Sequence, residues 1–176
     1  MEEARSYGMQ EILKINMNKA NLTGINLNES NFKRPNLIGA EFIEANLKGF
    51  HFKGANFREA NLEGANLNWA MLRGANLLES YLVWTNLTGA NLEWTDLMKV
   101  NLGWADFRWA NLKGANLEGA NLEGAEFREA HYLTFDQLSK VKTLHDAKLN
   151  AELLNSLSKE HAHLLKGKYS YQLKNL

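Results

Sequence analysis

The sequence predicts an all-β solenoid: a parallel β-helix with a four-sided cross-section, closed at its C-terminal end by short α-helices. Three observations predict this fold. A large apolar residue occupies every fifth position, a small residue lies two places before it, and Asn or Asp lies between them. The first pattern runs without a break from Leu22 to Tyr132, where the 23 positions hold sixteen Leu, six Phe and one Tyr.

A period of five residues excludes both an α-helix and a flat β-strand. On an α-helix, residues five apart are rotated by about 140°, so the leucines would scatter around the axis. In a flat strand, an odd spacing would send successive leucines to opposite faces. A bend of about 90° after every five residues instead turns all of them inward, and four pentapeptides close a coil of 20 residues. The predicted core therefore includes Leu62, Leu67, Leu72, Leu77, Leu82 and Leu87.

The other positions of the repeat have separate tasks. The alanine two places before the leucine points inward near a corner, where little volume remains. The asparagine faces outward and can bond to turn backbone or to the next coil. Glycine is frequent two places after the leucine, where a tight turn gains from its freedom in φ. Local widening is expected where a large residue replaces the alanine, at Ile25, Pro35, Phe50 and Val100.

Repeats such as Ala115-Asn116-Leu117-Glu118-Gly119 resemble those of the pentapeptide-repeat proteins, and the resemblance covers Ala20 to Thr134. It implies a right-handed quadrilateral β-helix. The chain then divides into an N-terminal cap or degenerate first coil (1–19), the β-helix (20–134) and a C-terminal helical cap and tail (135–176). Relatives often dimerise end to end, so the resemblance also implies a possible homodimer through the C-terminal region.

The C-terminal segment carries helix signals. Thr134 begins a short capped helix, with Leu138 and Val141 on one side. Asn150 is a predicted N-cap for a helix from Ala151 to about Leu165, with Gly167 as its stop. Residues 147–149 resemble a detached pentapeptide, and residues 169–173 alternate like a strand.

No chemistry-bearing motif emerges. The chain has no cysteine, and its five histidines are too scattered to share a metal. A filled axis leaves no cleft for paired carboxylates. We therefore expect no catalytic, cofactor or metal site and no enzyme activity. The net charge is zero, no apolar run approaches the length of a membrane span, and the first residues do not form a secretory signal, so we expect a cytoplasmic protein.

Sorting the outward residues by face reveals a polarity. The acidic face (20–24, 40–44, 60–64, 80–84, 100–104 and 120–124) carries Glu41, Glu44, Glu63 and Glu123 and no cation. The opposite, basic face (30–34, 50–54, 70–74, 90–94, 110–114 and 130–134) carries Lys33, Arg34, Lys53, Arg73 and Lys113 against Glu93.

All five tryptophans lie two places after a core residue, at positions 69, 84, 94, 104 and 109. On the acidic face, Trp84 and Trp104 stack in one column beside Tyr81 and Val83. These four residues form either a partner-binding patch, since exposed aromatics are typical of hot spots, or a cover for turn backbone.

Two functions follow. The first is a rigid, non-catalytic protein–protein interaction scaffold that presents this patch to a protein partner not identified by the sequence. The alternative comes from the resemblance: some relatives mimic duplex DNA and modulate DNA gyrase, a type II topoisomerase. A duplex of about 29 Å carries roughly 17 charges, whereas the acidic face has four, so the charge count disfavours mimicry. Direct nucleic-acid binding by the basic face is also disfavoured, because no aromatic projects from its interior to stack on bases.

Overall fold

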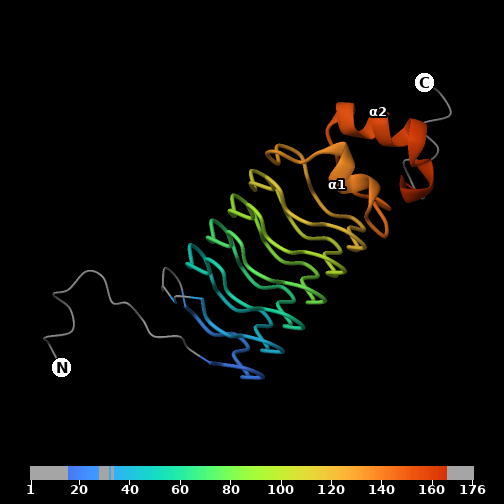
Figure 1. The fold of residues 1–176 in the computed structure, drawn as a ribbon. Coiled ribbons are helices and arrows are strands. Elements are labelled where there is room, and N and C mark those ends of the chain that lie inside the picture. Colours follow the sequence, from blue (N-terminus) through green and yellow to red (C-terminus); the bar gives the residue numbers. More distant parts are fainter. Residues whose placement is uncertain (1–15, 28–31, 33, 166–176) are drawn as a thin grey trace, which may run out of the picture.

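The computed structural model describes residues 16–27, 32 and 34–165. They form a right-handed quadrilateral β-helix with helices at its C-terminal end (Figure 1), as the sequence predicts. Parallel bridges join residues 20 apart, from Asn16↔Asn36 to Asn111↔His131. Each coil therefore holds 20 residues, and one pentapeptide forms each of its four faces.

The backbone hydrogen bonds explain why the five positions differ, and residues 65–69 show the pattern. The N–H groups of Asn66, Leu67 and Trp69 donate to carbonyls of neighbouring coils, at 2.8–2.9 Å. The N–H of Ala65 closes the preceding turn on Leu62. The remaining N–H, of Asn68, donates to the Asn66 side-chain Oδ1 at 3.1 Å. All five donors of the repeat are thus satisfied, and the last of them needs the asparagine.

The asparagine column also links the coils to one another. Asn66 Nδ2 donates to Asn46 Oδ1 at 3.4 Å, and Asn121 Nδ2 donates to Asn101 Oδ1 at 3.0 Å. These amide ladders run parallel to the rod axis and add to the backbone rungs.

The axis is filled by the leucine and alanine columns. The six leucines predicted as core, from Leu62 to Leu87, are each fully buried. Thr85 and Thr95 replace alanine and remain buried because each hydroxyl donates to a carbonyl of the preceding coil, Leu62 O and Leu72 O respectively, both at 2.9 Å. A buried hydroxyl without such a partner would be costly.

The large residues in the alanine column are also accommodated. Phe50 is fully buried and stacks on Phe52, with ring centroids 3.8 Å apart. At Pro35 the missing N–H is the one that would close a turn, as Ala40 N does on Leu37 O. The proline therefore removes no hydrogen bond between coils. A proline is tolerated in a stack of this kind only under that condition.

The end of the register differs from what the sequence predicts. Tyr132 continues the five-residue spacing but is 65% exposed, with φ of 59°, so Phe127 is the last core residue of the unbroken series. The chain then rejoins the stack, because Asn121 pairs with Thr143 and Glu126 with Lys148, an interval of 22 instead of 20. Leu144 is fully buried in this final coil, and the sequence analysis missed it.

Helix α1 (Phe135–Ser139) accounts for the longer interval. Its N-cap is Thr134, as the sequence predicts, and Thr134 forms a reciprocal capping box with Gln137. Gln137 Nε2 also donates to Leu112 O and Ala115 O, both at 2.9 Å, so the helix closes the last complete turn of the rod.

Helix α2 (Ala151–Glu160) has the predicted N-cap, since Asn150 Oδ1 accepts from Leu153 N at 2.9 Å. It ends five residues before the predicted Leu165, because His161 leaves the helical conformation. A 3-10 helix, η2 (Ala162–Leu165), follows and buries Leu164 and Leu165. Its Leu164 O accepts from Leu144 N at 2.9 Å and closes a rung of the final coil.

Several expectations fall outside the described residues: most of the N-terminal segment, Lys33, Gly167 and the tail at 169–173. Within the described part of the chain, no helix has the length and apolar character needed to cross a bilayer.

The corners of the rod have one conformation. The residue two places after each core residue has positive φ, whether it is Gly64 (62°), Glu44 (55°) or Trp84 (60°). A type II turn requires this conformation at its third position, although non-glycine residues rarely adopt it. Side chains at these corners run along the rod toward the next coil: a Cβ added to Gly64 would lie 3.6 Å from Glu44 Cγ, and one added to Gly54 would lie 3.4 Å from Arg34 Cγ.

The asparagine column yields a first prediction. Asn91 Oδ1 accepts from Glu93 N at 3.0 Å, so Asn91→Ala should lower the free energy of unfolding by about 1–2 kcal/mol. Met71 precedes Asn91 in the same column and offers the N–H of Arg73 only a thioether. Met71→Asn should therefore raise the free energy of unfolding by about 0.5–1 kcal/mol. Urea titration measures both changes, and equal destabilisation by both substitutions would contradict the role given to the column.

The corners yield a second prediction. Gly74 and Gly114 share φ of 65°, but a Cβ on Gly74 meets nothing within 4 Å, whereas one on Gly114 would lie 2.2 Å from the ring of Trp94. Gly74→Ala should cost only backbone strain, about 1 kcal/mol. Gly114→Ala should cost about 1–3 kcal/mol more, because the ring is displaced.

Introducing Gly114→Ala into a Trp94→Ser background should remove the additional cost. Thermal or urea unfolding of the four proteins in this double-mutant cycle measures the coupling. Additive effects would show that the ring and the glycine do not interact.

Candidate interaction surface

The tryptophan rings contribute to the packing between coils. Rings of Trp69, Trp94 and Trp104 lie on the glycines of the next coil, where an added Cβ would be 2.2–2.6 Å from the nearest ring atom. Trp84 has no glycine ahead of it and stacks on Trp104 instead, with ring centroids 5.4 Å apart and planes 14° from parallel. Three of the five rings therefore cover a turn of the following coil, as one of the two interpretations of the sequence requires.

The same rings remain substantially accessible to solvent. The five tryptophans are 45–60% exposed, Trp84 the most and Trp104 the least. Of the predicted patch, Tyr81 is 38% exposed and Val83 is half-buried beside Gly103. Tyr81 occupies the asparagine column and pairs with Asn61 and Asn101, which fixes it on the acidic face. The structure thus places all four predicted residues on one face, with Trp84 and Trp104 at its corner.

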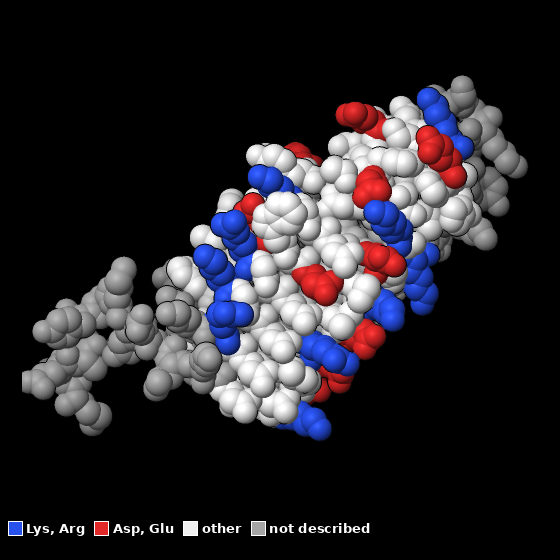
Figure 2. All heavy atoms as spheres, viewed as in Figure 1, with Lys and Arg blue, Asp and Glu red and all other residues white. Residues whose placement is uncertain are grey.

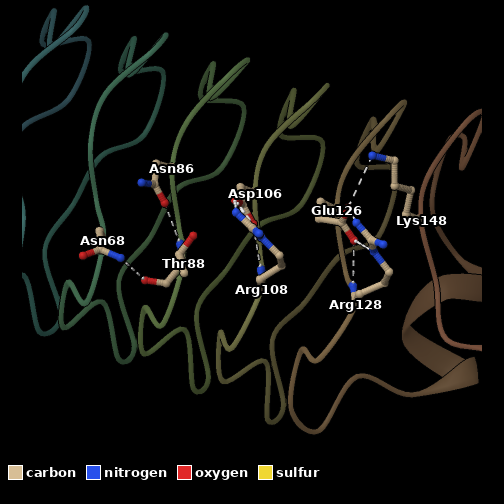
Figure 3. Close-up of polar contacts among 8 residues, drawn as sticks. All are labelled: Asn68, Asn86, Thr88, Asp106, Arg108, Glu126, Arg128 and Lys148. Atoms are coloured by element: carbon tan, nitrogen blue, oxygen red, sulfur yellow. Dashed lines mark hydrogen bonds and ion pairs between the residues drawn. The ribbon is translucent and has the colours of Figure 1, made fainter.

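A second face begins at that corner, and the sequence analysis did not single it out. We call it the arginine face; it comprises residues 45–49, 65–69, 85–89, 105–109, 125–129 and 147–149. Beyond Lys48, its outward residues in 65–69 and 85–89 are neutral, and Asn68 Nδ2 donates to Thr88 O at 3.0 Å. Toward the C-terminal end they are charged (Figure 3).

The charged part contains two internal clamps. Arg108 binds Asp106 through Nε and Nη2, the shortest contact being 2.7 Å. One coil further, Arg128 binds Glu126 in the same way, also at 2.7 Å. Lys148 approaches Glu126 Oε2 at 3.4 Å. Figure 3 shows these side chains in successive coils along the rod.

A shallow, open hollow of about 350 Å³ lies over these pairs. It extends from the tryptophan corner across the clamps to the final coil, and is lined by Trp104, Asp106, Arg108, Gly124, Glu126, Arg128 and Lys148. Three cations against two carboxylates give the lining a formal charge of +1. The sequence signal was available: an acidic residue followed two places later by arginine recurs at 106–108 and 126–128, one coil apart.

The arginines of the clamps lower the pKa of both carboxylates. Burial would raise the pKa of Asp106, but hydrogen bonds from Arg108 and its charge outweigh burial and hold the pKa below the ordinary value. The pKa of Glu126 is lowered in the same way, against burial, by Arg128 and with help from Lys148. The hydrogen bond and charge of Asp106 in turn raise the pKa of Arg108. The lining therefore keeps fixed charges near neutral pH.

Charges elsewhere on the rod are interleaved. Figure 2 shows basic and acidic side chains side by side over the visible face. On the basic face, Glu93 accepts ion pairs from Arg73 at 3.4 Å and Lys113 at 3.9 Å. On the acidic face, Glu123 lies 3.4 Å from His145 Nδ1 of the final coil. Within the described ranges, no three His, Asp or Glu residues cluster as potential metal ligands.

Known proteins with the same repeat match the chain. It matches the Pentapeptide repeats family in eight copies, over residues 15–54, 40–77, 51–89, 65–103, 75–114 and 105–131. No curated protein matches it in sequence. Among solved structures, HetL of Nostoc sp. strain PCC 7120, a pentapeptide repeat protein involved in heterocyst differentiation regulation, is 28% identical, with a TM-score of 0.36 over 78% of this chain and 71% of HetL.

Two other structures extend the comparison. A second pentapeptide repeat protein from Nostoc PCC 7120 is 30% identical, with a TM-score of 0.38 over 73% of this chain and 99% of that protein. QnrB1, a plasmid-mediated fluoroquinolone resistance protein, is 16% identical, with a TM-score of 0.43 over 92% of this chain and 93% of QnrB1. With the repeat matched over most of the β-helix, the chain belongs to the pentapeptide-repeat family.

Proposed function

We propose that this protein is a rigid, non-catalytic scaffold of the cytoplasm that binds a protein partner through the Trp84–Trp104 corner and the adjoining hollow. The stacked pair carries the proposal: one face of each ring is used in stacking, yet Trp84 is 60% and Trp104 45% exposed. Tryptophan, tyrosine and arginine are the residues most enriched at binding hot spots. All three types occur here, within Tyr81, the tryptophan pair and the two arginine clamps.

Rigidity supports the same role. The donors of a repeat are satisfied within the rod, and both clamps hold their arginines in one orientation before a partner arrives. A preorganised surface loses less side-chain entropy on binding. A protein partner would therefore meet fixed charges and fixed rings.

The absence of catalysis is part of the proposal. Asp106 and Glu126 are the acidic residues of the hollow, and the pKa of each is lowered, which moves it further from neutral pH. General acid–base catalysis works best with a pKa near the working pH. Their engagement by arginine suits fixed recognition better than proton transfer.

Mimicry of DNA has less support. A duplex presents a charge about every 1.7 Å, whereas the acidic face carries only four carboxylates, one of them beside His145. Gyrase binding thus remains an outcome of the test below. The possible C-terminal homodimer stays a separate prediction.

Affinity capture from host lysate tests the scaffold. The baits are the wild-type protein, the double variant Trp84→Ser, Trp104→Ser, and the control Trp94→Ser, whose ring lies at the diagonally opposite corner. Thermal melting checks that each bait is folded. A protein retained by the wild type and the control, but reduced at least tenfold on the double variant, is the expected result.

The retained protein must then bind directly, as a purified component, with the same ranking of the three baits. Equal retention by all folded baits would contradict the assigned corner. Recovery of gyrase subunits would restore the DNA-mimic alternative.

A further inference from the structure

Trp84 differs from the other tryptophans in the residues that precede it along the rod. One coil before each tryptophan, the two residues at the corner are Lys48-Gly49 for Trp69, Glu63-Gly64 for Trp84, Arg73-Gly74 for Trp94, Val83-Trp84 for Trp104 and Thr88-Gly89 for Trp109. Trp84 is thus the one tryptophan with a carboxylate in this place.

Backbone hydrogen bonds place these residues in successive coils. Glu44 N donates to Glu63 O at 2.8 Å. Gly64 N donates to Val83 O at 2.9 Å. The corner column therefore runs from Glu44 through Gly64 to Trp84. The side chain of Glu44 extends along this column toward Trp84, because its Cγ lies 3.6 Å from where a Cβ of Gly64 would be. Both carboxylates therefore belong to the surface just before Trp84.

The ring of Trp84 has one face outside the tryptophan stack. Its other face stacks on Trp104, with planes 14° from parallel. Trp84 is nevertheless 60% exposed, the largest fraction among the five tryptophans. Since Trp104 lies further along the rod, the outer face of the Trp84 ring is turned back toward the coil that carries Glu63 and Gly64.

The charge around this ring face is negative. The acidic face carries no Lys or Arg. Within the part of the chain that the structure describes, neither Glu44 nor Glu63 forms an ion pair. On the neighbouring arginine face, Lys48 lies two coils before Trp84, and Arg108, one coil after it, is clamped by its own carboxylate. A partner that approaches Trp84 therefore meets an exposed indole beside two carboxylates that have no internal cation.

The diagonally opposite corner contains the cation that this corner lacks. At Trp94, Arg73 occupies the place that Glu63 has at Trp84. Arg73 pairs with Glu93 at 3.4 Å, and the Trp94 indole N–H donates to Glu93 Oε1 at 3.0 Å. A guanidinium, a carboxylate and an indole are thus linked within the rod at Trp94. At Trp84 the carboxylates and the indole are present without the guanidinium.

We propose that Trp84, Glu44 and Glu63 bind an arginine side chain of the protein partner. Its guanidinium lies on the outer face of the indole and donates to the two carboxylates. Cations bind to the face of an aromatic ring, best to that of tryptophan, and the planar fork of arginine suits carboxylates better than an ammonium does. The inference rests on the proposed scaffold function for the source of the arginine, and it gives the partner a chemical character.

Nuclear magnetic resonance of the full chain tests this with N-acetyl-argininamide as the probe. The Trp84 indole N–H and the Gly64 amide signals should shift together and saturate, with half-saturation on the order of 10 mM. The Trp94 indole should not follow the same curve. N-acetyl-citrullinamide, which has the same shape without the charge, should bind at least fivefold more weakly. Equal binding of the two probes, or no saturable shift at Trp84, would overturn the proposal.

Carboxylate variants locate the site. Glu44→Gln and Glu63→Gln should each weaken binding of the arginine probe at least threefold, and together at least tenfold. Glu118→Gln removes the same charge on another face and should leave binding within 1.5-fold of the wild type. Equal weakening by all three would show that the probe responds only to net charge, which contradicts the site. Thermal melting checks folding, and Trp84→Ser, followed through the Gly64 amide, is a second loss variant.

A lysine probe sets the class of cation. N-acetyl-lysinamide should bind at least threefold more weakly than the arginine probe, because its ammonium is a point charge without a planar face. Equal or tighter binding would overturn the assignment to arginine. The titration needs no partner, so it can fail independently of the capture experiment. A captured partner without arginine binding would contradict this inference alone, whereas arginine binding without a captured partner would contradict the scaffold alone.

Discussion

A left-handed corner conformation every five residues is the constraint on which the rest of this structure depends. Each corner turns the chain by a quarter of a revolution, so that every fifth side chain points to the axis and every coil repeats after 20 residues. The bend also prevents the chain from pairing as long strands, and the coils meet instead through single bridges such as Asn66↔Asn86. With such short segments, stability depends on satisfying all the donors of each repeat, and the asparagine side chain supplies the acceptor that the backbone lacks.

The corner conformation also determines what the surface can present. Side chains at φ near 60° lie along the rod, so a large ring must rest on whatever the next coil offers at the same corner. Glycine gives it room at 89, 114 and 124, and another tryptophan gives it a stacking partner at 104. The tryptophans are therefore structural and accessible at once, because packing uses one face of a ring and leaves the remainder to solvent. The structural contacts of these rings therefore do not exclude a role in binding a partner.

The sequence was sufficient for the fold because the repeat specifies it locally. Period, inward columns and both helix N-caps were predictable from residues such as Leu72, Thr134 and Asn150. Tyr132 was wrongly placed in the core series, because the five-residue spacing alone does not reveal where the side chains stop pointing toward the axis. Leu144 was missed because α1 lengthens one coil by two residues and shifts the register, although the interval from Leu144 to Leu149 preserves the period. The arginine clamps escaped notice because their significance lies in contacts between residues two apart, on a face whose net charge is small.

The 20-residue coil has a consequence for how such a protein can change its length. Removing or duplicating a whole coil would leave every downstream side chain on its original face. Removing a single pentapeptide would rotate everything beyond it by about 90°, so that Arg108 and Arg128 would no longer share a face with Asn66. Helix α1 shows a third route, in which an insertion is looped out at one corner and Lys148 still pairs with Glu126. Whether the residues of a binding surface stay together on one face of this rod therefore depends more on the length of insertions and deletions than on the identity of individual residues.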